Sequence, residues 1–155
     1  MPIEQFLVIQ EDEASHSTVL QSVLKSLNQE PITSCKFNFD AVLKDVATMA
    51  TVARVVELVG VGAYLGAAPL VKDPSLLVAA GSILTVEARH QTILNIMSSN
   101  GTAIPSAFDI GLTPNEVLAL ASPFFDGPCD LGVPRSYFWL FTIQKYILIL
   151  ILFTS

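Results

Sequence analysis

Apolar residues recur at alternating intervals of three and four along three stretches of the chain. This spacing places them on one face of an α-helix. It predicts three long helices, roughly over residues 2–27, from 39 or 40 to about 65, and from 74 to the Asn-Gly pair at 100–101. Asp40 and Asp73 are the expected N-caps of the second and third helices. The apolar stripes consist of Phe6, Ile9, Leu20, Val23 and Leu27; of Leu43, Val46, Ala50, Ala53, Gly60 and Tyr64; and of Leu76, Ala80, Ile83, Leu94 and Met97.

A shorter helix is predicted near the C-terminal end of the patterned region. Residues 113–116 read Thr-Pro-Asn-Glu, a capping box with proline at the first helical position. The helix should run to about Leu120 and end before Pro123.

Each long stripe is interrupted only by glutamate or histidine. The interruptions are Glu13 and His16, then Glu57, then Glu87 and His90. Both histidines of the chain therefore lie three residues after a glutamate, a spacing that shares one helix face. Because a buried, unpaired carboxylate is costly, these positions favour a shared pair of divalent cations.

The residue types suggest which metals would bind. Dinuclear iron or manganese carboxylate bundles use a Glu-x-x-His from each of two helices and a lone Glu from each of two others. Glu57 fits one lone position, and the sequence offers no second. We therefore expect a di-iron or di-manganese centre held by Glu13, His16, Glu57, Glu87 and His90. The alternative is no cofactor, with these side chains paired with one another or with Arg54 and Arg89. The residue types do not decide whether the protein is an enzyme.

The second helix is rich in small residues, which would let another helix approach closely. Two glycines in its interior, Gly60 and Gly62, each cost about 1 kcal/mol relative to alanine, which points to a packing need or a local bulge. Tyr64 lies two turns beyond Glu57 and could bond a ligand carboxylate or shuttle an electron, although a core tyrosine is the commoner case. The small residues are Ala50, Ala53, Gly60, Gly62 and Gly66.

Composition narrows the class of protein. The length of 155 residues suits one domain that is large enough to bury a core. Of all residues, 52% are apolar and 14% are charged. A net charge of −6 without a Lys/Arg cluster argues against a nucleic-acid partner. The first ten residues lack the features of a signal peptide.

Several segments of the sequence resemble the ferritin-like domain of fungal stress-response proteins and plant desiccation-related proteins. The distinctive runs are VVELVGVGAYLGAAP at 55–69 and ILTVEARHQTIL at 83–94, supported by DEASHSTVLQSVL at 12–24 and IPSAFDIGLTPNEVLALASPFF at 104–125. The resemblance implies an all-α, ferritin-like helical bundle and a role in stress or desiccation. A non-enzymatic protective or interaction protein without metal, on the same fold, is the alternative function.

The resemblance also implies differences at the two ends. The family's first helix, with its own glutamate, has no counterpart, so we expect three long helices and self-association through the groove that the missing helix leaves. We divide the chain into a ferritin-like domain over residues 1–130 and a hydrophobic, non-family tail over 131–155. Residues 137–153 could contact a membrane or fill that groove, although the apolar run is too short to span a bilayer.

The two cysteines, Cys35 and Cys129, suggest one disulfide if the protein is secreted, as members of the family often are. Two free thiols in a cytosolic protein are the alternative.

Overall fold

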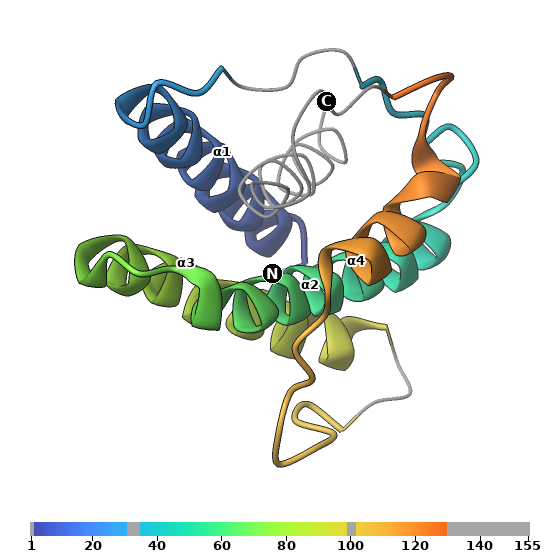
Figure 1. Ribbon diagram of the computed structural model, residues 1–155. Coiled ribbons are helices and arrows are strands. Elements are labelled where there is room, and N and C mark those ends of the chain that lie inside the picture. The colour runs from blue at the N-terminus through green and yellow to red at the C-terminus, as the bar shows by residue number, and fades with distance from the viewer. Residues whose placement is uncertain (1, 31–34, 99–101, 130–155) are drawn as a thin grey trace. The chain divides into compact units, whose positions relative to one another are not determined.

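The computed structural model describes residues 2–30, 35–98 and 102–129 (Figure 1). Within these ranges the chain is helical, and its one β-bridge joins Phe37 to Phe125. This confirms the predicted all-α class. The elements in chain order are α1 (Pro2–Ser26), α2 (Val46–Ala67), the 3₁₀ turn η1 (Ala68–Leu70), α3 (Pro74–Met97), α4 (Pro114–Ala121) and the 3₁₀ turn η2 (Ser122–Phe124).

The chain forms two compact units, which we describe separately. The hairpin unit comprises residues 42–117 and contains α2 and α3. The α1 unit comprises residues 1–41 together with residues from 118 onward. The predicted tail at 131–155 lies outside the described residues, as does the Asn-Gly pair expected to end α3.

The start of α2 differs from the prediction. Asp45 is the N-cap, and its carboxylate accepts hydrogen bonds from the Thr48 backbone N–H at 2.8 Å and hydroxyl at 2.7 Å. Asp40, the predicted cap, lies in a turn that precedes the helix. Leu43 and Val46 consequently fall outside the buried stripe and are 46% and 72% exposed. Asp45 is the better cap because it has a threonine three residues later, which bonds the carboxylate twice.

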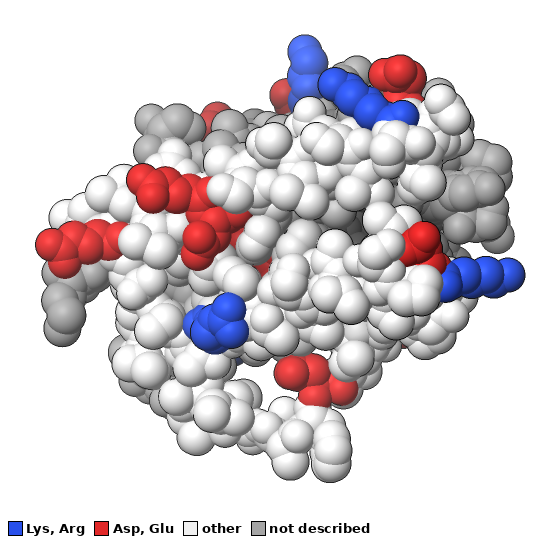
Figure 2. Space-filling model, turned by 90° about the vertical axis from the view of Figure 1, so that its left-hand side faces the viewer, with Lys and Arg blue, Asp and Glu red and all other residues white. Residues whose placement is uncertain are grey.

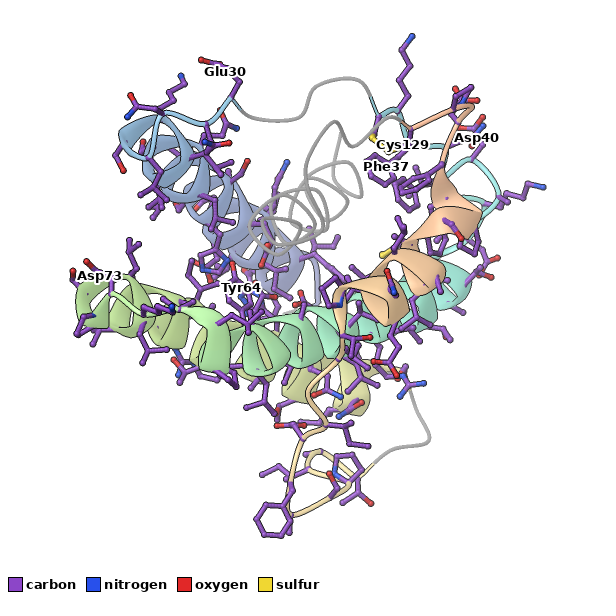
Figure 3. The ribbon with its side chains drawn as sticks, in the orientation of Figure 1. Glu30, Phe37, Asp40, Tyr64, Asp73 and Cys129 are labelled. Carbon is purple, nitrogen blue, oxygen red and sulfur yellow. A yellow bond between two sulfur atoms is a disulfide. The ribbon has the colours of Figure 1, made fainter. Side chains whose placement is uncertain are left out.

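The start of α3 is as predicted. Asp73 is the N-cap and Pro74 the first helical residue (Figure 3). The Asp73 carboxylate accepts the backbone N–H groups of Ser75 and Leu76, together with the Ser75 hydroxyl. The N-terminal groups that no helical carbonyl can reach are thereby satisfied.

The chain after α3 returns along the hairpin and packs against α2. The Asn95 side chain donates to the Ala103 carbonyl at 3.1 Å, and the Leu112 N–H donates to the Gly62 carbonyl at 2.8 Å. A side chain at Gly62 would lie 2.7 Å from Leu112 Cγ, and one at Gly66 would collide with the Leu112 carbonyl oxygen. These two glycines therefore admit an extended segment, which corrects the expectation that they admit a helix.

Helix α1 buries the predicted face with two changes. Ile9, Glu13, His16 and Leu20 are buried, but so is Ser17, which is not part of the predicted stripe. Because the helix has 3.6 residues per turn, a buried stripe continued over several turns drifts from a strict alternation of three and four. Leu24 accordingly replaces Leu27 at the end of the stripe; Leu27 lies beyond the last helical residue and is 44% exposed.

In the α1 unit, two short antiparallel segments, residues 35–39 and 122–129, pair with each other, and we call them the aromatic clasp. Backbone N–H groups of Asn38 and Asp126 donate to carbonyls of the opposite segment at 2.9 Å. The Phe37 and Phe125 rings meet edge to face at 5.2 Å, and those of Phe39 and Phe124 stack at 5.0 Å. A disulfide joins Cys35 to Cys129, whose label lies beside that of Phe37 in Figure 3.

Helix α4 begins with the predicted capping box. The Glu116 carboxylate accepts the Thr113 backbone N–H and hydroxyl, both at 2.7 Å, and the Thr113 hydroxyl accepts the Glu116 N–H at 3.4 Å. The helix ends at Ala121, and Pro123 falls in η2 as expected.

The charged residues are sparse, as the composition indicates. Figure 2 shows one face on which uncharged side chains make up most of the described surface. In the part of the chain that the structure describes, one helical stretch, Val46–Leu70, has the length and mean hydropathy (1.6) of a membrane span. Half of its 18-residue apolar window is buried, and the buried Glu57 lies in the same helix, as is typical of the core helix of a globular domain.

Candidate metal centre

Helices α2 and α3 bring three of the predicted ligands together. Glu57 comes from α2, and Glu87 and His90 come from α3. One ligand atom from each of these residues lies within 4.8 Å of those from the other two. The side chains meet because α2 and α3 run antiparallel, so that Glu57 lies opposite His90 and Gly60 lies opposite Glu87.

This cluster is inside the protein. Glu57 is 0% exposed, Glu87 2% and His90 5%. Most of the neighbouring buried positions are apolar or small, including Ala53 and Val56 on α2 and Leu94 on α3. Two carboxylates at so short a distance repel each other when both are ionised, and the low dielectric of the surroundings strengthens that repulsion. Positive charge placed between them is therefore strongly favoured.

The imidazole of His90 partly supplies such a partner. Its Nδ1 lies 3.3 Å from Oε1 of Glu57. This contact is an ion pair only when the imidazole is protonated. A neutral imidazole can instead ligate a metal ion through a ring nitrogen, and metal-bound histidines are held in orientation by carboxylates in the same way.

A second Glu-His pair lies on α1. Nδ1 of His16 is 3.4 Å from Oε1 of Glu13, and both residues are buried. The contact follows from their separation of three residues on a regular helix. The structure therefore brings Glu57, Glu87 and His90 together in the hairpin unit, and Glu13 with His16 in the α1 unit. That all five form one site stays a prediction.

Tyr64 is also on α2 and is 3% exposed (Figure 3). Its distance of seven residues from Glu57 places both on one face of the helix. The sequence pattern predicts this burial, which is typical of a core tyrosine as well as of one beside a metal site.

The sequence reasoning missed two buried polar residues on α3. Gln91 is 8% exposed and Asn95 is 4% exposed. Asn95 fixes the segment after α3 through its bond to Ala103. The two are four residues apart and so lie on one side of the helix, next to the predicted stripe. That spacing is the only sequence signal that could have revealed them.

The donor set of the hairpin unit suits a metal ion. Two carboxylates and one imidazole, all buried and close together, are hard or borderline ligands that bind iron, manganese or zinc. Carboxylates can bridge two ions, whereas an imidazole caps one. The three side chains could therefore hold one ion fully within the α2–α3 hairpin or part of a dinuclear centre.

Comparisons with known proteins agree with this architecture. The family model described as "Ferritin-like domain" matches residues 3–100. This range includes α2, α3 and all of α1 except Pro2. A search of curated proteins found no match. The matched segment is more than half of the 155 residues and carries Glu13, His16, Glu57, Glu87 and His90. The chain therefore belongs to the ferritin-like domain family.

Proposed function

We propose that this ferritin-like protein binds a pair of iron or manganese ions through Glu13, His16, Glu57, Glu87 and His90. The observation that carries the proposal is the cluster of Glu57, Glu87 and His90, whose ligand atoms lie within 4.8 Å of one another in the interior of the helix pair. Two carboxylates held so close together inside the protein favour a cation bound between them.

Three observations support adding Glu13 and His16 to this set. They repeat the Glu-x-x-His spacing of Glu87 and His90, and they are buried on α1 between the apolar core residues Ile9 and Leu20. The ferritin-like match extends over their helix. A Glu-x-x-His on each of two helices is the arrangement by which ferritin-like proteins hold dinuclear metal centres.

The role that we propose is in stress or desiccation, and it rests on the sequence resemblance. The distinctive runs at 55–69 and 83–94 are the parts that resemble stress-response and desiccation-related proteins. A bound iron pair would supply redox chemistry towards oxygen or peroxide, and a manganese or zinc pair would supply Lewis acidity. The residues of this chain would bind the ions, exclude bulk water and neutralise their charge.

Metal analysis of the purified, full chain tests the proposal. The protein should retain close to two ions of iron or manganese after mild purification and dialysis against the metal. The double variant Glu87→Ala/His90→Ala should lose most of them, because it removes two of the three ligands of α2 and α3. Glu30→Ala is the matched control: Glu30 is an exposed glutamate (Figure 3), and its loss should not change the metal content. Less than about half an ion per chain, unchanged in the double variant, would refute the proposal.

A metal-free function is the second candidate, and one observation favours it. Each histidine already lies against a carboxylate, at 3.3 Å and 3.4 Å, so two Glu-His pairs could serve as structural contacts in a protective or interaction protein. Oxygen consumption with added ferrous iron separates the two candidates. Turnover that is lost in Glu57→Ala supports the metal centre. Its absence in a protein that also binds no metal supports the metal-free function.

A further inference from the structure

We propose that Gly60 is a positioning residue for Glu87, and that its missing side chain is what allows the Glu87 carboxylate to lie against α2. The proposal concerns a residue outside the ligand set, and its relevance to metal binding rests on the proposed function. The observation behind it is the immediate surroundings of Gly60. A Cβ built at this position would lie 3.1 Å from Glu87 Oε2, 3.5 Å from Cδ and 3.9 Å from Cγ.

The backbone does not require glycine at this position. Gly60 lies in the interior of a regular α-helix, Val46–Ala67, and among the described residues the positive φ angles are those of Asn28 and Gly127. Glycine destabilises a helix interior relative to alanine, because it has more conformational freedom to lose. A buried glycine in such a place therefore implies that something else occupies the space of a methyl group.

The occupant at Gly60 is a single side chain. The three nearest atoms to the built Cβ all belong to Glu87. Gly62 and Gly66, on the same helix, meet Leu112 and the residues beside it instead. Gly81, in α3, meets nothing within 4 Å. The glycines of α2 and α3 thus fall into three classes, and Gly60 is the one that faces a candidate ligand.

The contact fixes the position of the carboxylate relative to Glu57. Gly60 follows Glu57 by three residues on α2, so a Glu87 carboxylate that lies against Gly60 is held one helical turn from Glu57. A methyl group there would come closer to Oε2 than ordinary van der Waals contact allows and would push the carboxylate away from α2. The two carboxylates would then be spaced less well for a common ion.

A double-mutant cycle on the metal-free, full chain tests the steric part. Gly81→Ala should raise the melting temperature by about 2–4 °C, the gain expected for alanine in a helix interior. Gly60→Ala should give no gain or a loss, because the methyl group displaces Glu87. In a Glu87→Ala background, Gly60→Ala should recover the gain of about 2–4 °C. In a Glu87→Gln background, Gly60→Ala should not recover this gain, because glutamine keeps the size of the side chain and changes only its charge.

The same variants decide the outcome even if one of them does not fold. If Gly60→Ala alone is unfolded and Gly60→Ala/Glu87→Ala is folded, the proposal is supported. Equal effects of Gly60→Ala in the presence and absence of the Glu87 side chain would overturn it. Relief by Glu87→Gln as complete as by Glu87→Ala would overturn it too, since that result would point to desolvation of a charge and not to space.

Titration with Co²⁺ tests the consequence for the site. Gly60→Ala should weaken Co²⁺ binding by about 10–100-fold, as expected when the support of a ligand is disturbed. Gly81→Ala should bind as the unchanged protein does. Equal affinity in Gly60→Ala and the unchanged protein would overturn the positioning role. If the unchanged protein binds no Co²⁺, iron or manganese, the proposed function fails, and the melting-temperature cycle still decides the steric claim.

Discussion

Gly66 and Leu112 are in contact through their backbones, and this makes position 66 the least tolerant glycine of the hairpin unit. A methyl group at Gly66 would collide with the carbonyl oxygen of Leu112, which cannot swing aside as the end of a flexible side chain can. The segment that holds Leu112 is itself fixed by a hydrogen bond to Gly62.

We expect Gly66→Ala to lower the free energy of unfolding by about 1–3 kcal/mol, the usual cost of overpacking. Urea unfolding followed by circular dichroism measures it, with Gly81→Ala as the control that introduces the same methyl group into open space. A Gly66→Ala protein at least as stable as the Gly81→Ala protein would show that the contact with Leu112 is not maintained in solution.

At the scale of residues, the sequence pattern predicts burial well where it depends on the helix alone. Glu57, Glu87 and His90 are buried as predicted because the interruptions of an apolar stripe share its face. The partner of Gly62 could not be predicted in this way. It is Leu112, fifty residues further along the chain, and no local periodicity connects the two.

The capping residues decide how accurately the start of each helix can be predicted from the sequence. The starts of α3 and α4 are as predicted, because each has a capping residue beside a proline that fixes the first turn. The predicted start of α2 is wrong by about one and a half turns, because Asp40 and Asp45 are both residue types that can cap a helix. What distinguishes them is Thr48, which bonds the Asp45 carboxylate through two groups.

The capping carboxylates make helix stability depend on acid. Bonds from the Ser75 hydroxyl, and then from the Leu76 and Ser75 N–H groups, lower the pKa of Asp73 below its ordinary value of 3.8. The Thr113 hydroxyl and N–H likewise lower the pKa of Glu116 below 4.5, and Thr48 lowers the pKa of Asp45. A lowered pKa in the folded state means that the stabilisation is complete above the unfolded pKa and is lost as the pH falls through the folded one.

We therefore expect the Asp73→Asn variant to lose part of the acid dependence of the melting temperature. Asparagine is an equally good cap by type and cannot be protonated in this range. The unchanged protein should fall in melting temperature faster than Asp73→Asn as the pH drops below about 4. Parallel curves for the two proteins from pH 7 to pH 3 would contradict the role given to the Asp73 charge.

At the scale of the whole molecule, the disulfide joins two residues that are far apart in the sequence. Cys35 and Cys129 are 94 residues apart, and α2 and α3 lie entirely between them. Closing a loop of this length restricts the unfolded chain strongly. In the chain-entropy description, the stabilisation is about 4–5 kcal/mol.

Reduction should accordingly lower the free energy of unfolding by up to about 4–5 kcal/mol. Urea unfolding with and without reductant measures the change, and Cys35→Ser/Cys129→Ser should show the lower stability without responding to reductant. Thiol titration of the unreduced, denatured protein is an independent check, since two titratable thiols would show that the bond is not formed.

The sequence predicts the class of fold but little of how distant segments meet. Helical periodicity is local, and with the caps it identifies both ends of α1 and the start of α3 to within a residue. The aromatic clasp depends on phenylalanines near residues 37 and 125, which no spacing rule connects. The cysteines within it could be paired in advance only because the chain has two of them.

The bond between Cys35 and Cys129 also decides what happens when the backbone is cut. Phe108 is 87% exposed in the segment between α3 and α4, which makes this segment accessible to a protease. A cut there separates the sequence into two pieces, one with Cys35 and the other with Cys129. The pieces stay joined through sulfur, so the nicked molecule keeps its full mass until a reductant divides it.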